Sequence, residues 1–258
     1  MKRYFLFLLL FIFRGLALVA QSETLILPFD ATTLTDEQKA SNPDFLAYPI
    51  GVAEQVPKIN CNQTIDCMEF VDLGLSVKWA TCNIGAEKPE DYGDYFAWGE
   101  VESKDTYDWT TYLHCKGTNK NLTKYCNRSS YGDNGFTDRK TVLDPEDDVA
   151  HVNWEVSWRM PTDKEFTELL EECKWTWINQ NGVNGNKVVG PNGNSIFLPA
   201  AGYLIGSNLF GVGSYGDYWS SSLYDVNDHA YCIYFETSNA KRNYDNRSYG
   251  LTIRPVCE

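Results

Sequence analysis

The sequence predicts an α+β domain in which short antiparallel strands surround two helices and long irregular loops. The first observation is a helix signal, because Thr162 can be the N-cap and Glu165 can complete a capping box. Apolar residues follow at i, i+3, i+4 and i+7 from Phe166, which is one face of a helix. The second observation is a predicted hairpin of Lys187–Val189 and Ser195–Leu198 around a Pro-Asn-Gly turn. Strands that follow one another so closely indicate an antiparallel sheet rather than βαβ units.

The remaining elements are expected to be short. A second helix should begin near Leu143–Ala150, with Asp144 as its cap and Pro145 at its first position. Residues 84–142 are rich in Gly, Asp, Asn and Tyr, which predicts a long irregular insertion held down by aromatic side chains. The tail predicts strands at Ala230–Phe235 and Leu251–Val256, separated by polar turns.

The N-terminal region divides into two segments ahead of the predicted domain. Residues 1–20 have a basic start, a short apolar run and a small residue, Ala20, which is typical of a cleaved secretory signal. We therefore expect a secreted, periplasmic or cell-surface protein. The alternative, a retained anchor, is disfavoured because the uninterrupted apolar run is too short to span a bilayer. Residues 21–66 predict an extended arm or linker, and residues 67–258 the domain itself. No other stretch predicts a membrane span.

Net charge limits the class of partner. The 258 residues carry a formal charge of −13, and loss of the three basic residues of the signal leaves 19 basic against 35 acidic residues. Such a chain repels phosphate backbones, so nucleic acid is not an expected partner. A calcium-rich or carbohydrate-rich surrounding is compatible with this charge.

Eight cysteines in an exported chain permit disulfides. We expect one or two bridges, since a chain of this length can bury a core without them. Cys115–Cys126 is one predicted pair, and Cys257 can pair with Cys67 or with Cys173. Buried free thiols are the competing interpretation for the cysteines in strand-like segments, which are Cys82 and Cys232.

Six motifs occur in a fixed order along the chain. They are Val71–Asn83, Gly93–Glu100, Trp158–Thr162, Leu198–Gly202, Tyr218–Ser222 and Arg254–Val256. In this order they resemble the Fibrobacter succinogenes major paralogous domain family, common in exported proteins of gut Bacteroidetes, over roughly residues 68 to 257. The resemblance implies a C-type-lectin-like fold, shared with formylglycine-generating enzymes and with variable proteins of diversity-generating retroelements. It also implies that the two ends of the domain pair in one sheet and that loops form a ligand face.

The residues predict no catalytic centre. None of the three histidines has a neighbouring hydrolase or metalloprotease motif, and a G-x-G-x-x-G match at residues 211–216 predicts a turn because no helix follows it. No cofactor is expected. Calcium is a weak alternative at Asp144, Asp147 and Asp148, since hard cations prefer carboxylate oxygens. Acidic side chains that favour the helix dipole are the stronger interpretation, and the calcium motifs of sugar-binding C-type lectins are absent.

The predicted ligand face lies between Leu223 and Tyr249. This segment is rich in Tyr, Asn and Asp, which combine rigid contact area with adaptable hydrogen bonding. The candidate ligand residues in the segment are Tyr224, Asp225, Asn227, Asp228, His229, Asn239, Arg242, Asn243, Tyr244, Asp245, Asn246 and Arg247. An ordinary polar rim of loops is the competing interpretation. Trp98 and Trp109, in the irregular insertion, are the tryptophans expected to be exposed.

Three functions follow from these features. The first is a non-catalytic domain that binds a glycan or a protein at the cell surface. The second is a fimbrial or surface-assembly subunit whose N-terminal arm adds a strand to a partner. The third, disfavoured one is an enzyme of the formylglycine-generating type, which would bind copper through paired cysteines.

Overall fold

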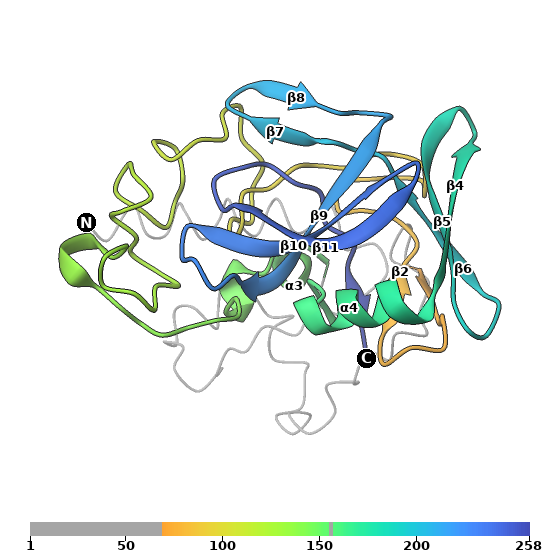
Figure 1. Cartoon of the computed structure of the whole chain (residues 1–258), viewed down its shortest axis with the longest axis horizontal. Coiled ribbons are helices and arrows are strands. Elements are labelled where there is room, and N and C mark those ends of the chain that lie inside the picture. The colour runs from red at the N-terminus through yellow and green to blue at the C-terminus, as the bar shows by residue number, and fades with distance from the viewer. Residues whose placement is uncertain (1–68, 155–156) are drawn as a thin grey trace, which may run out of the picture. The chain divides into compact units, whose positions relative to one another are not determined.

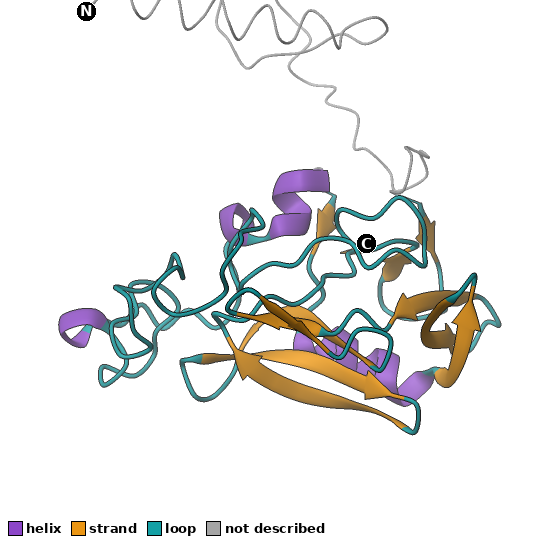
Figure 2. Cartoon of the chain, turned by 90° about the horizontal axis from the view of Figure 1, so that it is seen from above, coloured by secondary structure: helices purple, strands orange, loops and turns teal. Residues whose placement is uncertain are grey.

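A computed structural model describes residues 69–154 and 157–258, which belong to one compact unit, Pro57–Glu258. The predicted signal at 1–20, the predicted arm at 21–66 and Cys67 lie outside the described residues. The described part consists mostly of antiparallel strands in four small sheets, with two α-helices and long irregular stretches. The predicted α+β class is confirmed (Figures 1 and 2). No helix within these two ranges is both long and apolar enough to cross a membrane.

The largest strands form one three-stranded antiparallel sheet. Its order is β11 (Asn239–Asn246), β10 (His229–Glu236) and β9 (Tyr215–Leu223). Figure 1 shows these blue strands crossing the middle of the described domain. Antiparallel partners point to the same face of a sheet, and neighbours along a strand point to opposite faces. The register therefore decides which side chains of this sheet meet.

The two ends of the described domain meet in a second sheet. Its order is β1 (Phe70–Val71), β2 (Lys78–Ala80), β12 (Val256–Cys257) and β3 (Trp158–Arg159). Val256 is opposite both Trp79 and Arg159, so the last strand is held between the first strands and the middle of the chain. This agrees with the end-to-end pairing that the family resemblance implied.

Two hairpin sheets complete the strands. One contains β4 (Lys174–Gln180), β5 (Val183–Val189) and β6 (Ser195–Pro199), on the right of Figure 1. The predicted hairpin is confirmed, because Val189 pairs with Ser195. The other sheet contains β7 (Tyr203–Ile205) and β8 (Asn208–Phe210).

The longer helix, α4 (Asp163–Glu172), begins where the sequence predicts it. The Thr162 side chain accepts a hydrogen bond from the Glu165 N–H, and the Glu165 carboxylate accepts one from the Thr162 N–H, so the capping box is complete. Phe166 and Leu169 are buried in a core cluster that also contains Ile233 of β10. Hence α4 covers the face of the β9–β10–β11 sheet that carries Ile233, as the two views in Figures 1 and 2 show.

The other helical segments are short and lie ahead of β3. A 3-10 turn, η4 (Pro145–Asp147), has Asp144 in the cap position and Pro145 first, as predicted, although no side-chain cap bond forms. The α-helix that follows is α3 (Val149–Trp154). Asp148 begins it by accepting hydrogen bonds from the N–H groups of Ala150 and His151.

The predicted irregular insertion at 84–142 is confirmed; besides short bridges, it contains one 3-10 turn, η3 (Asp133–Gly135). Aromatic side chains bind it to the sheet. The indole of Trp98 donates to the Ser220 carbonyl, and that of Trp219 donates to the Phe96 carbonyl, in a crossed pair of 2.8 and 2.9 Å. Since both indoles are fully buried, the insertion is part of the core rather than a detachable loop.

Candidate functional site

One face of the β9–β10–β11 sheet carries an aromatic cluster beyond the N-terminal end of α4. Tyr231 of β10 and Tyr244 of β11 are direct antiparallel partners and therefore share a face. Tyr224, just after β9, lies against both rings. We call Tyr224, His229, Tyr231, Arg242 and Tyr244 the tyrosine patch.

The rings of the tyrosine patch are in defined contact. Tyr224 and Tyr244 are stacked, with centroids 4.0 Å apart and an interplanar angle of 12°, while Tyr231 meets Tyr224 edge-on at 5.0 Å. His229 lies edge-on to Tyr244 at 5.6 Å. Tyr244 nevertheless remains 46% exposed. Such an arrangement presents a preorganised aromatic surface to solvent.

Ion pairs hold Arg242 and His229 of the tyrosine patch in place. The Arg242 guanidinium lies 3.9 Å from the Tyr231 ring centroid and donates two hydrogen bonds, of 2.6 and 2.7 Å, to the Asp163 carboxylate at the start of α4. This pairing raises the pKa of Arg242 above its ordinary value. Arg242 is thus fixed as a cation at the border between the helix and the patch.

A second charged group fixes the imidazole of His229. Its Nδ1 lies 2.9 Å from Asp228 Oδ1, and Asn119 donates to Asp228 Oδ2 at 2.6 Å. Burial raises the pKa of Asp228, but the hydrogen bonds from His229 and Asn119 outweigh it, so the net shift is downward. The Asp228 carboxylate is therefore ionised and oriented toward the patch histidine.

The structure brings together only part of the predicted ligand face. Tyr224, His229 and Tyr244 meet in the tyrosine patch, Asp228 supports it, and Asp225 is exposed next to it in sequence. Asn243 does not join them. It pairs with Cys232, so it points to the opposite face of the sheet.

Three predicted ligand residues are fully buried instead. The expected exposure of Trp98 is wrong, because Trp98, Asn227 and Arg247 are all 0% exposed. The Asn227 side-chain oxygen accepts hydrogen bonds from the N–H groups of Asn127 and Arg128. These polar groups hold the insertion against the tail of the chain, and none of them is left for a ligand.

Arg247 has a structural environment on all sides. Its guanidinium donates to the hydroxyl of Tyr112 and to the carbonyls of Lys124, Tyr125 and Asn227 at 2.9 to 3.1 Å. It also lies 4.9 Å from the Trp98 ring centroid. A side chain with five donors and four bonds inside the protein is a cross-link rather than a binding group.

Trp109 is half-buried and takes no part in the tyrosine patch. Its ring is edge-on to Tyr112 at 5.4 Å, in a small cluster with Tyr107 within the insertion. Its indole therefore supports the insertion on one side and remains partly accessible on the other.

The predicted calcium carboxylates are already paired with protein donors. The Lys124 ammonium lies 2.9 Å from Asp144 and 2.5 Å from Asp147, in the position where a cation would stand. Hydrogen bonds from Lys140 and Lys124 lower the pKa of Asp144. Asp148 is buried, which raises its pKa, and its oxygens accept from the N–H groups of α3 and of Met160. These contacts support the alternative interpretation, in which the acids are structural.

The predicted disulfide between Cys115 and Cys126 is not formed. Both are free thiols, and each donates to a nearby carbonyl, that of Trp109 at 3.1 Å and that of Arg128 at 3.2 Å. Burial raises the pKa of both thiols, which therefore stay protonated. The loop that they would have closed is instead held by hydrogen bonds such as that from the Thr123 N–H to the His114 carbonyl, 2.9 Å long.

The other cysteine predictions divide. Cys173 is a free thiol, so its predicted bridge to Cys257 is also not formed, and burial raises its pKa to about 11. The alternative pair, Cys67–Cys257, includes a residue outside the described part of the chain. Cys82 and Cys232 are buried free thiols, which confirms the competing interpretation for these two.

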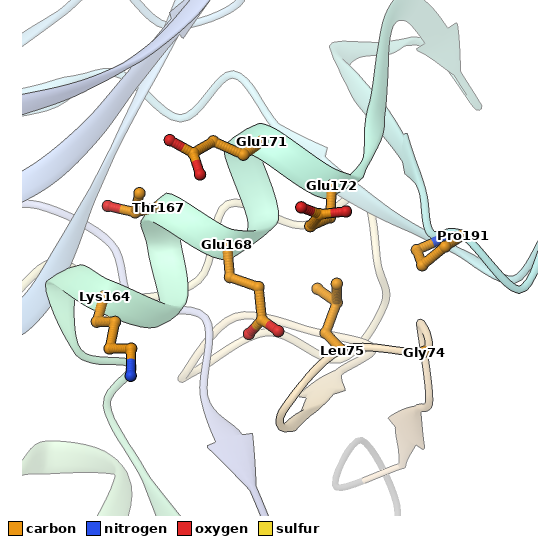
Figure 3. Close-up of a pocket in the computed structure, with 8 residues that line it drawn as sticks. All are labelled: Gly74, Leu75, Lys164, Thr167, Glu168, Glu171, Glu172 and Pro191. Carbon is orange, nitrogen blue, oxygen red and sulfur yellow. The ribbon is translucent and has the colours of Figure 1, made fainter.

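A surface hollow of about 380 Å³ lies on the far side of α4 (Figure 3). Its lining includes Lys164, Glu171 and Glu172 of the helix, opposite Leu75 and Pro191. Glu168, also in the lining, accepts a hydrogen bond from the Ser76 N–H at 3.0 Å and a second from the Ser76 hydroxyl. The hollow thus contains a helix-to-loop contact and a group of solvated acids. These features alone do not indicate a ligand site.

Sequence reasoning missed Tyr231, because it lies inside a strand expected to be buried core. Alternation along the strand was the available signal, since Tyr231 and Ile233 occupy one face while Cys232 occupies the other.

Comparison with known proteins finds no matching family model, no similar curated protein and no similar solved structure. The tyrosine patch therefore has to be interpreted from its own chemistry.

Proposed function

We propose that this chain is an exported, non-catalytic domain of the C-type-lectin-like type that binds a glycan or a protein at the cell surface through the tyrosine patch. The observation that carries the proposal is the stacked pair of Tyr224 and Tyr244, whose outer ring is 46% exposed. Rigid tyrosines with an adjacent arginine are the side chains that most often dominate recognition surfaces. Asp225, exposed beside them, adds a hydrogen-bond acceptor.

Preorganisation supports this proposal. Tyr231, Arg242 and Asp163 fix the floor of the patch, and Asp228 fixes His229. A ligand that contacts these side chains would therefore immobilise few additional rotamers, which lowers the entropic cost of binding. The two alternatives have less support. The assembly arm lies outside the described residues, and the patch contains no cysteine, whereas the enzyme alternative requires a pair of them.

The test uses the protein after removal of residues 1–20, screened on a glycan array and as bait in a pull-down from surface extracts. Tyr244→Ala is the patch variant, and Phe210→Ala is its control, because Phe210 is an aromatic residue of similar exposure, 42%, on β8. We expect Tyr244→Ala to weaken the binding of any ligand found by about 30-fold, the usual effect of losing a dominant contact. Phe210→Ala should change it less than about threefold.

Two outcomes would contradict the proposal. One is an empty array and an empty pull-down with a protein whose near-ultraviolet circular dichroism shows a fixed fold. The other is a ligand whose affinity is equally affected by both substitutions, or by neither. The array and the pull-down separate the glycan from the protein ligand.

A further inference from the structure

The opposite face of the same sheet brings three potential metal ligands together. Asp217 of β9, Cys232 of β10 and Asp245 of β11 place one carboxylate oxygen, the thiol sulfur and another carboxylate oxygen within 4.8 Å of one another. The register places them on one face, because Cys232 stands opposite Trp219 and Asn243. Asp217 lies two residues before Trp219, and Asp245 lies two residues after Asn243. Side chains two residues apart share a face.

The cluster is buried and lacks donors. Asp217 and Cys232 are each 1% exposed, and Asp245 is half-buried. The Oδ1 atom of Asp217 has no hydrogen-bond partner among the described residues. Neither acid forms an ion pair within these residues, and the contact described for Asp245 is with the Cys232 thiol, 3.7 Å from Oδ2. A buried, unpartnered carboxylate oxygen costs free energy unless a donor or a cation satisfies it.

The buried surroundings raise the pKa of all three groups. Burial raises the pKa of Asp217, helped by the nearby Asp245, and burial likewise raises the pKa of Cys232. Burial raises the pKa of Asp245 to about 6.

Charged and titratable neighbours do not fill this role. Lys241 of β11 reaches Asp217 only through a long-range interaction, and it is exposed. His229 acts on Asp245 in the same way, but its Nδ1 is held by Asp228. The hydroxyls of Tyr215, Tyr234 and Tyr249 also border the acids, and all three have a raised pKa, chiefly from burial. No described cation neutralises the cluster.

We propose that Asp217, Cys232 and Asp245 bind one divalent ion of the zinc class. Thiolate and carboxylate together suit zinc, which bonds sulfur at about 2.3 Å and oxygen at about 2.0–2.2 Å, whereas calcium and magnesium avoid sulfur. Those bond lengths place tetrahedral ligand atoms about 3.3–3.8 Å apart, and the Cys232–Asp245 separation of 3.7 Å is within that range. Three protein ligands leave a fourth position for water or for a donor from a bound molecule.

The test measures zinc and cobalt binding by the reduced protein without its first 20 residues. Equilibrium dialysis should find one zinc ion per chain with a Kd at or below about 1 μM. Cobalt(II) should give a thiolate charge-transfer band in the near ultraviolet. Cys232→Ser should remove that band and weaken zinc binding by about 100-fold or more, since changes even outside the ligand set cost 10–100-fold. Cys126→Ser removes another buried thiol and should leave both readouts unchanged.

A second variant covers the case in which Cys232→Ser does not fold. Asp245→Asn changes a half-buried side chain, and it should keep the cobalt–thiolate band but weaken zinc binding by at least about tenfold. The proposal is overturned if the folded wild-type protein binds no zinc at millimolar concentration. It is equally overturned if the charge-transfer band persists in Cys232→Ser, or if Cys126→Ser abolishes it.

Discussion

Arg247 allows the structural and the ligand-binding interpretations of the tail to be separated. Replacement by Met keeps an unbranched, apolar stem but removes the guanidinium. Three carbonyl oxygens, those of Lys124, Tyr125 and Asn227, then lose their charged donor. The fourth hydrogen bond of Arg247, to the Tyr112 hydroxyl, is lost as well. A buried acceptor left without a partner costs about 1–3 kcal/mol. The three carbonyls alone therefore predict a loss of about 3–9 kcal/mol in the free energy of unfolding.

The magnitude is large against the 5–15 kcal/mol that stabilise a typical domain. Arg242→Met is the matched control, because it removes an arginine from the same strand region whose side chain is 47% exposed and paired with Asp163. An exposed ion pair contributes about 0–1 kcal/mol. We expect Arg247→Met to lose at least about 3 kcal/mol and Arg242→Met at most about 1 kcal/mol.

The assay is urea denaturation followed by tryptophan fluorescence, with the reductant held constant. Arg247→Lys is the milder variant, for use if Arg247→Met does not fold, since its ammonium can still reach one or two of the carbonyls and about half of the loss should remain. The reasoning fails if Arg247→Met unfolds within about 1 kcal/mol of the wild type. It fails as well if Arg242→Met is the more destabilised of the two, because burial would then not decide the cost.

Three further predictions concern the scaffold. Thr162→Ala should lower the free energy of unfolding by about 1 kcal/mol through loss of the cap, and an unchanged urea midpoint would contradict the capping box with Glu165. Burial lowers the pKa of His114 below 6.5, so the unfolded state binds the proton first; stability should fall as the pH drops below 6.5, by up to about 1.4 kcal/mol per pH unit, and less steeply in His114→Gln. An NMR titration that places the His114 pKa at or above 6.5 would refute this. Gly202→Ala, whose added Cβ would stand 1.9 Å from a backbone oxygen, should unfold at lower urea than Gly117→Ala, which has a similar positive φ but open space around it.

Local signals in the sequence were sufficient for α4 and for the hairpin of β5 and β6. The capping box of Thr162 and Glu165 and the Pro-Asn-Gly turn each act within a few residues, and each appears where it was predicted. Composition was also sufficient to predict the irregular insertion, because its aromatic residues are the ones that bury it. Confirmed elements of this kind identify the α+β class, but they do not show where the ligand face lies.

Burial was the property that the sequence could not provide. Trp98 and Arg247 are 149 residues apart in numbering, yet the guanidinium lies over the indole in the interior. Tyr, Asn, Asp and Arg in a tail segment have the same composition whether they face solvent or cross-link a loop. Only the fold distinguishes Arg247, with four internal hydrogen bonds, from Arg242, which is half-exposed at the tyrosine patch.

Alternation along β10 explains both why the two candidate sites coexist and why one of them was missed. Tyr231 faces the tyrosine patch, and the next residue, Cys232, faces the two acids. Asp217 and Asp245 are 28 residues apart, a spacing that matches no metal motif, and they meet only because β9 and β11 both pair with β10. A slip of one residue in either pairing would exchange the faces and destroy both sites at once. A metal ion that joins all three strands would oppose such a slip, so zinc bound on one face would help to keep the tyrosines in register on the other.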